Sequence, residues 1–96
     1  MHVISKKALR QFWKRRPDAE QPLRRWFKIV TFAEWQSFAD VRAVYAGADQ
    51  VGRFTVFNIG GNKYRIVAAV HYNRGKVYIR HVLTHRDYDQ GKWKED

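Results

Sequence analysis

The N-terminal stretch carries its apolar side chains at the spacing of an amphipathic helix, with lysines and arginines filling the rest. Four residues share the apolar face of this predicted helix: Ala8, Leu9, Phe12 and Trp13. Ser5 precedes the pattern as a good N-cap, and Ile4 and Leu9 have the spacing of a hydrophobic staple. Pro17 should end the helix, because the residue before a proline avoids the helical region.

A second helical pattern follows this proline. Its apolar face holds Leu23, Trp26, Phe27 and Val30. Asp18 or Gln21 is the candidate N-cap, and Pro22 then falls in the first turn, where proline is tolerated. We expect this helix to run into the low 30s, and a short third helix to span about residues 38–45.

The second half of the chain changes to the period of β-strands after a turn-rich stretch at residues 47–52. Three strands are predicted, at about residues 53–59, 63–72 and 76–83. A Gly-Gly-Asn turn at residues 60–62 joins the first two, and Gly75 suits the positive φ of a bulged turn before the third. The β-branched pair Val3 and Ile4 could add a further strand at the N-terminus.

This order of elements predicts an α+β fold, with the N-terminal helices packed on one face of a small antiparallel sheet and the other face open. In the strand at 63–72, one alternating set is apolar enough for the core: Tyr64, Ile66, Ala68, Val70 and Tyr72. Lys63 and Arg65 then belong to the solvent face. Whether Arg80 of the next strand joins them depends on the register, since a slip of one residue reverses every side chain.

The length, charge and cysteine content of the chain limit the number of domains and the classes of binding partner. The 96 residues are enough for one domain, 1–96, with a modest core, and they carry a formal net charge of +10. The charge is spread out, with ten Lys or Arg against four acids in residues 1–48 and nine against five in residues 49–96. Such a body attracts polyanions, so nucleic acid is the favoured partner. Cysteine is absent, and no apolar run resembles a membrane span or a signal peptide, so we expect a cytoplasmic protein without a membrane partner.

The region from residue 58 to residue 89 has the side chains that metal-free RNA cleavage requires. Cleavage by the ribose 2′-OH needs a base for the hydroxyl proton, cations for the charge on the phosphorane, and an acid for the leaving oxygen. The expected catalytic residues are His85 as base or acid, Arg65 as phosphate clamp, Tyr88 as proton donor or stacking ring, and Lys63 as second cation. The expected RNA-binding residues are Arg80, Asn62, Asp89 and Lys92.

Each of these residues also has an ordinary structural interpretation. His85 is then a surface histidine, Arg65 a solvated strand arginine and Lys63 a plain surface lysine. Tyr88 packs in the core, and Asp89, which could instead orient the histidine, is an acid at the start of a helix. The proximity of the histidine, the tyrosine and the aspartate in the sequence favours the catalytic interpretation.

We expect no metal and no cofactor. The four histidines do not form a defensible ligand set, and no acidic cluster is typical of a magnesium-dependent nuclease. The glycines at residues 60–61 are not a P-loop, because the Gly-Lys-Ser/Thr ending and the following helix are missing. They indicate a tight turn between strands.

Three segments carry a resemblance to a known family: residues 57–65, residues 78–80 and residues 84–89, which read FNIGGNKYR, YIR and THRDYD. Together with the opening residues 1–9, they resemble the HigB toxins, which belong to the RelE-like group of bacterial toxin–antitoxin systems. The similarity covers nearly the whole chain, is most specific between Asn58 and Asp89, and is looser between Pro17 and Asp49.

The resemblance implies a compact α+β fold and a type II toxin that cleaves messenger RNA, usually on the ribosome. It also implies a helix-turn-helix antitoxin of the HigA type, through which DNA is contacted only indirectly. By this match Arg65 is the strand cation, His85 the histidine after the last strand and Tyr88 the aromatic that follows. Two alternatives stay open: a non-catalytic basic RNA-binding module, and a basic structural subunit whose charge balances an acidic partner.

Overall fold

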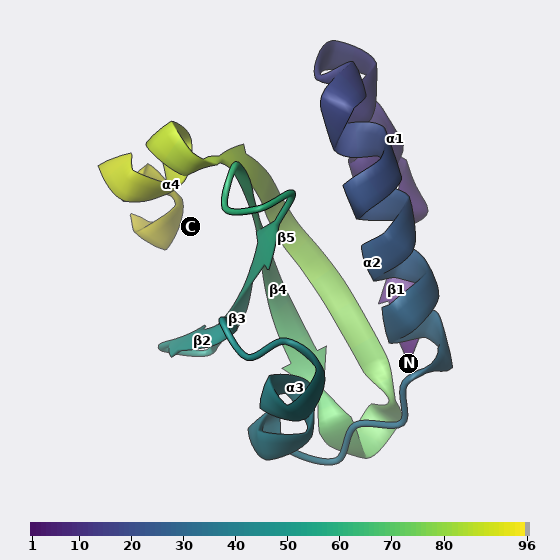
Figure 1. Ribbon diagram of the computed structural model, residues 1–96. Helices are drawn as coiled ribbons and strands as arrows, with labels where there is room; N and C mark the ends of the chain where they lie inside the picture. The colour runs from purple at the N-terminus through teal and green to yellow at the C-terminus, as the bar shows by residue number, and fades with distance from the viewer. Residues whose placement is uncertain (96) are drawn as a thin grey trace.

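The computed structural model describes residues 1–95, which form three layers with the sheet in the middle. In Figure 1 the long helices α1 (Lys6–Arg15) and α2 (Glu20–Phe32) lie along one side of the sheet, and α4 (His85–Gln90) lies on the other side. The short helix α3 (Phe38–Val44) sits at the end of the molecule opposite α4. A 3-10 helix, η3 (Lys92–Glu95), follows α4.

The sheet has five strands in the order β1-β5-β4-β3-β2. Their bounds are β1 (His2–Ile4), β2 (Asp49–Val51), β3 (Phe54–Ile59), β4 (Tyr64–His71) and β5 (Lys76–Thr84). The strands β2 to β5 form an antiparallel meander, and β1 pairs in parallel with β5. The predicted α+β class is confirmed, but the sheet is mixed rather than antiparallel, because the N-terminal strand joins the last one.

The main core lies between the sheet and the helices. Phe57 of β3 is at its centre, with its ring 5.3 Å from that of Trp26, 6.1 Å from that of Trp35 and 5.4 Å from that of Tyr45. The predicted helical face supplies Leu9, Phe12 and Trp13 to this core, and the predicted strand set supplies Tyr64, Ile66 and Ala68. The alternation in the sequence therefore assigned this face correctly.

The opposite face of the sheet is not open along its whole length. A second, smaller cluster of buried residues lies there, made of Phe54, Val56, Val67 and Trp93. Trp93 comes from η3 and folds back onto the sheet so that 4% of its surface is exposed. The expectation of an open face is wrong here, because α4 and η3 form a thin layer over it.

A β-bulge determines the register of β5 around Arg80. Val67 is opposite His81 and the next residue, Ala68, is opposite Ile79, so Arg80 is the extra residue on β5. Arg80 is exposed and lines a hollow of about 400 Å³ together with Arg53, Phe54 and Ala69. Phe54 and Ala69 belong to the second cluster, so Arg80 borders the face on which Arg65 lies.

The helix ends differ in detail from the predictions. Ser5 occupies the N-cap position of α1, but its side chain makes no cap hydrogen bond and only its carbonyl accepts one, from the Ala8 amide at 3.2 Å. Neither Asp18 nor Gln21 caps α2, whose N-cap is Ala19. A 3-10 turn at Pro17–Ala19 leads directly into α2 and leaves Asp18 to accept a hydrogen bond from the Tyr64 hydroxyl at 2.6 Å.

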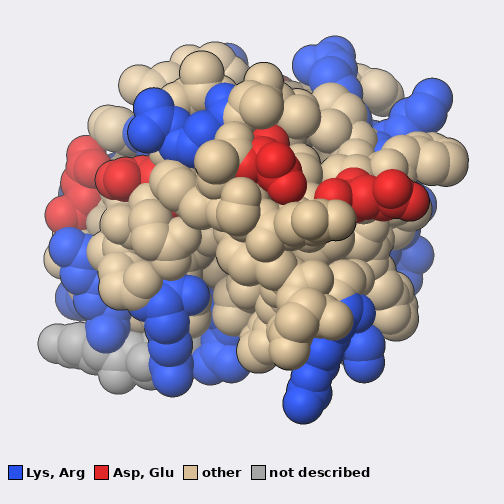
Figure 2. Space-filling model, turned by 90° about the horizontal axis from the view of Figure 1, so that it is seen from below, with Lys and Arg blue, Asp and Glu red and all other residues tan. Residues whose placement is uncertain are grey.

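The charged side chains are not evenly spread over the surface. At the end of the molecule that carries α3, acidic side chains cross the middle of the surface and basic side chains surround them (Figure 2). The net positive charge is therefore diluted at this end. Within residues 1–95, no helix combines the length and apolar character that crossing a bilayer requires.

Candidate active site

The turn between β3 and β4 holds the guanidinium of Arg65. Gly60, Gly61 and Asn62 all have positive φ, 84° in the case of Asn62, and the resulting tight turn brings polar atoms over the start of β4. One terminal nitrogen of Arg65 donates to the carbonyls of Asn62 at 3.0 Å and Tyr64 at 3.1 Å. The other donates to the Asn62 side-chain oxygen at 2.7 Å. The turn thus fixes the plane of the guanidinium.

Arg65 is buried, with 7% of its surface exposed. Burying a cation costs the free energy of its hydration unless hydrogen bonds and opposite partial charges surround it. The carbonyls of the turn supply these to Arg65. The sequence places Arg65 on the side of the sheet away from the main core, which is correct. The expectation that it is solvated is wrong, because α4 and η3 cover this part of the face.

His85 meets Arg65 at the junction of β5 and α4. The pairing of Tyr64 with Thr84 brings the two strand ends together, and the His85 amide donates to the Lys63 carbonyl at 2.9 Å. The Thr84 hydroxyl caps α4 by accepting from the Asp87 amide at 3.1 Å, which fixes the first turn of the helix. His85 Nδ1 then lies 2.9 Å from a terminal nitrogen of Arg65.

The partners of the imidazole define its tautomer. A guanidinium can only donate hydrogen bonds, so His85 Nδ1 must be the acceptor and the ring proton is on Nε2. His85 Nε2 is 3.1 Å from a carboxylate oxygen of Asp89, one helical turn further on, which is the acceptor for the Nε2–H group in this tautomer. The side chains of His85 and Asp89 are 50% and 58% exposed, so both reach solvent, whereas Arg65 is buried.

Tyr88 closes the site on the side of η3. Its ring lies 5.4 Å from the guanidinium carbon of Arg65 and is stacked on Trp93, with ring centres 5.1 Å apart. The indole of Trp93 donates to the Tyr88 carbonyl at 2.9 Å. Burial is the main cause that raises the pKa of Tyr88, and the nearby negative charge of Asp49 adds to it. The phenol therefore keeps its proton at neutral pH.

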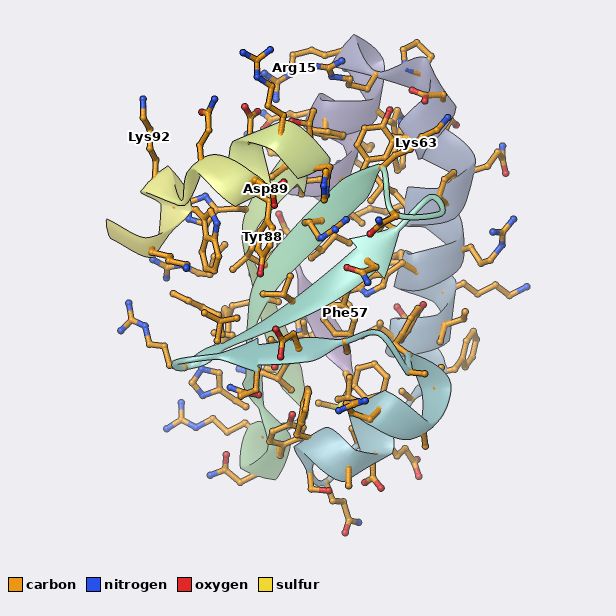
Figure 3. The ribbon with its side chains drawn as sticks, turned by 60° about the vertical axis from the view of Figure 1, so that its left-hand side comes forward. Arg15, Phe57, Lys63, Tyr88, Asp89 and Lys92 are labelled. Carbon is orange, nitrogen blue, oxygen red and sulfur yellow. The ribbon has the colours of Figure 1, made fainter. Side chains whose placement is uncertain are left out.

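Five sequence-predicted residues thus lie in one cluster: Asn62, Arg65, His85, Tyr88 and Asp89. The others lie around it. The Lys63 ammonium is 3.7 Å from Asp18 and 68% exposed, so it points to the helix side of the turn, as Figure 3 shows. Lys92 is exposed on η3, and Figure 3 places it at the other side of α4 from Lys63.

Two contributions to the site were missed by sequence reasoning. Trp93 supports Tyr88 and, through it, covers Arg65, but an aromatic in an unpatterned tail gives no sign of what it covers. The helix α4 orients His85 toward Asp89, and its signal was present in the Thr84 cap, the Asp87 three residues later and the Gly91 that ends it in a left-handed conformation.

The geometry suits acid–base chemistry on a phosphodiester. A histidine with a defined tautomer, a carboxylate on its Nε2, a guanidinium at its Nδ1 and a protonated phenol lie together at the surface. No group of three or more potential metal ligands occurs among the described residues.

Comparison with known proteins identifies the family. A family model described as HigB_toxin, RelE-like toxic component of a toxin–antitoxin system, matches residues 19–91. The chain is 33% identical over 92 residues to the mRNA interferase toxin HigB of Escherichia coli (strain K12), which covers 93% of this chain and 88% of that protein. The same figures hold for the mRNA interferase HigB of Shigella flexneri.

A more distant relative is the mRNA interferase HigB of Escherichia coli O6:H1 (strain CFT073). It is 20% identical over 93 residues, which cover 94% of this chain and 90% of that protein. The matched region of the family model contains every residue of the cluster around Arg65 and His85. The chain therefore belongs to the HigB family, the RelE-like toxic components of toxin–antitoxin systems.

Proposed function

We propose that this chain is an endoribonuclease that cleaves messenger RNA without a metal, using the ribose 2′-OH as nucleophile, and that it acts on the translating ribosome. The contact of 2.9 Å between the Arg65 guanidinium and His85 Nδ1 carries the proposal. It puts the strongest cation of the site beside its best proton acceptor, at a surface that RNA can reach. The family and the printed names of its relatives support the substrate.

His85 acts as the general base in this scheme, through Nδ1. Asp89 holds the Nε2 proton and keeps the imidazole in the tautomer whose Nδ1 has a free electron pair, as the carboxylate of a hydrolase triad does. When a phosphate enters, one of its oxygens replaces Nδ1 as the acceptor of the Arg65 N–H that is directed at the imidazole, while the other N–H groups stay on the turn. Nδ1 then takes the proton of the 2′-OH, and the 2′-oxygen forms a bond to phosphorus.

The P–O5′ bond breaks as the new bond forms, so the products are a 2′,3′-cyclic phosphate and a free 5′-hydroxyl. The guanidinium of Arg65 stabilises the extra negative charge on the phosphorane. The leaving 5′-oxygen takes a proton from the Tyr88 phenol, which burial keeps protonated at neutral pH and which recovers its proton from water. Lys63, outside the cluster, adds positive charge for the RNA strand near the turn.

Induced expression tests the activity and the assignment together. Wild-type protein should arrest growth and produce cleaved transcripts with 5′-hydroxyl ends in primer extension. Arg65→Ala and His85→Ala should each lower cleavage by about 10²–10⁴-fold, the usual contribution of a positioned catalytic group. Matched controls are Arg74→Ala and His71→Ala, an exposed arginine and histidine in and beside the turn between β4 and β5, which should cleave normally.

Full activity in Arg65→Ala and His85→Ala would remove the catalytic assignment. RNA binding by the wild-type protein with no cleaved transcripts, even with ribosomes present, would support the non-catalytic module instead. The role of Tyr88 is separable: Tyr88→Phe keeps the stack on Trp93, so loss of cleavage in this variant identifies the hydroxyl as the proton donor.

Ribosome dependence is tested by comparing cleavage of one transcript with and without ribosomes. We expect purified protein to cleave a transcript during translation in a reconstituted system and to leave the same transcript uncut when ribosomes are omitted. The open, shallow position of His85 and Asp89 supports this expectation, because a second macromolecule is needed to press the RNA strand against so exposed a site. Equal cleavage of free RNA would overturn it.

The expected partner is an antitoxin of the helix-turn-helix, HigA type with an acidic segment. The formal net charge of +10 favours such a segment, since opposite charge speeds association and shields the basic surface. Co-expression of the gene beside this one should relieve growth arrest, and the complex should weaken as salt is raised. A neighbouring gene product that neither binds nor protects would contradict this part of the proposal.

A further inference from the structure

A groove lies next to the candidate site, on the helix side of the sheet. The C-terminal end of α1, the last residues of β5 and the first turn of α4 form its walls, which enclose about 390 Å³. Two arginines, Arg15 and Arg16, line it together with Thr84 and Asp87, which flank His85 in the chain. Phe12, Val82 and Leu83 are its apolar lining residues.

The two arginines have N–H donors available for a ligand, although the charge of Arg16 also acts on Asp18. Both are exposed, and within residues 1–95 neither makes an ion pair. The guanidinium carbon of Arg15 lies 5.9 Å from the centre of the Phe12 ring, a weak contact that orients the side chain without satisfying its donors. A guanidinium with unused N–H groups beside apolar lining residues is a good receptor for phosphate oxygens, which it can bind in a bidentate manner.

We propose that this groove binds a phosphodiester of RNA next to the one that is cleaved, with Arg15 and Arg16 as its ligands. The inference rests on the proposed function, since it gives the RNA strand a second point of attachment. Figure 3 shows Arg15 and Lys63 at the same end of the molecule as α4, so a strand that leaves His85 over the end of β5 meets positive charge there. Two fixed phosphates hold the scissile bond in line better than one.

Replacement of Asp87, the acidic residue of the groove, should have the opposite effect on binding to replacement of the arginines. The carboxylate of Asp87 lies among the lining residues and repels a phosphate, whereas its backbone amide serves the Thr84 cap. Replacement of Asp87 by Asn removes the repulsion and keeps the cap. The proposal therefore predicts opposite effects of two substitutions in one groove, which a loss of folding cannot imitate.

The experiment measures binding in a His85→Ala background, so that the RNA stays intact. The probes are a short single-stranded RNA and purified ribosomes. Arg15→Ala with Arg16→Ala should weaken binding at least tenfold, and the slope of log affinity against log salt should become shallower by about 0.7 for each phosphate of a single strand that the protein no longer neutralises. Asp87→Asn should strengthen binding a few-fold.

A control with the same change of net charge is Arg42→Ala with Arg74→Ala, which alters exposed arginines in α3 and in the turn between β4 and β5. It should affect binding much less than the groove pair. Equal effects of the two pairs would mean that only the general field matters, and would overturn the proposal. Unchanged binding of both probes by the groove pair, or weaker binding by Asp87→Asn, would also overturn it.

The two probes identify the source of the phosphodiester. Weaker binding of the short RNA assigns the groove to the substrate strand, as proposed. Weaker binding of ribosomes alone would assign it to ribosomal RNA and overturn the placement next to the cleaved bond. The proposed catalytic function is tested separately by cleavage in proteins that retain His85. A wild-type protein that binds RNA through the groove but does not cleave it would refute the nuclease and leave the groove in place.

Discussion

On the helix side of the sheet, Phe57, Ile66 and Val77 are fully buried beneath the long N-terminal helices, whereas on the other side the thin layer of α4 and η3 covers Phe54, Val67 and Arg65. The first side is an apolar core that many elements share. The second combines a few apolar residues with a buried cation and the candidate catalytic groups. The comparison indicates that the fold and the site depend on different layers of one small molecule.

The largest effect should come from the centre of the main core. Phe57→Ala removes a ring that contacts three other aromatics, so we expect a loss of about 3–5 kcal/mol in the free energy of unfolding. Urea denaturation measures it. Phe32→Ala is the matched control, because 78% of Phe32 is exposed and its removal should change stability by less than about 0.5 kcal/mol.

Trp93→Ala tests whether the thin layer is a separate unit. Its global destabilisation should stay below that of Phe57→Ala, because the loss is limited by the free energy with which residues 85–95 dock. Cleavage should fall at least tenfold, since Tyr88 and Arg65 lose their cover. Hydrogen exchange should become fast in α4 and remain slow in β4; equal loosening of both would show a single cooperative core.

Asn62→Gly tests how much the Asn62 side chain contributes to holding the guanidinium of Arg65. Glycine keeps the positive φ and the backbone carbonyl, so only the side-chain acceptor at 2.7 Å from Arg65 is removed. A hydrogen bond to a charged group contributes about 1.5–3 kcal/mol, and we expect a loss at the lower end together with slower cleavage. Asn62→Asp retains an acceptor and should restore stability. Unchanged stability and cleavage in Asn62→Gly would show that the backbone alone holds Arg65.

The smallest effect should be on the pH dependence of stability, through the hydrogen bond between Tyr64 of β4 and Asp18 of the 3-10 turn before α2. The hydrogen bond from the Tyr64 hydroxyl lowers the pKa of Asp18, with Lys63 as a further cause. A lowered pKa in the folded state means a contribution that is complete above the unfolded value of 3.8 and is lost as the pH falls further. Tyr64→Phe should therefore flatten the decline of stability below about pH 4, in denaturation series at matched ionic strength. An unchanged acid profile in this variant would rule out the pair as its source.

The same pair acts at alkaline pH in the opposite sense. Asp18 accepts from the Tyr64 hydroxyl and raises the pKa of Tyr64 above its usual value of 10.0. This contribution is complete below that value and disappears as the pH rises through the folded pKa. The fluorescence of the four tryptophans reports unfolding in both ranges.

Much of the fold could be predicted because its signals are local. The predicted bounds of the three main strands agree with the structure to within one residue at either end, since alternation is visible in the sequence. The edge strand β2 was missed because its residues Asp49–Val51 are few and mostly polar. The helix α4 was missed because Tyr88 is its only large apolar residue, so it has no helical period.

The site could be predicted only in part. The residue types and their order pointed to Arg65 and His85, but their contact depends on the pairing of Tyr64 with Thr84 and on the bulge at Arg80, which shifts the register of the rest of β5. Long-range register is not encoded in local periodicity. Nor does the sequence show that a tail residue, Trp93, turns a strand arginine into a buried one.

The position of β1 has a consequence for how the molecule is made. Residues 2–4 are synthesised before residues 76–78, the segment of β5 with which they pair. His85 and Trp93 emerge later still, so a nascent chain holds neither the completed sheet nor the imidazole beside its guanidinium. A nascent chain that lacks residues 85–93 therefore cannot assemble the candidate site.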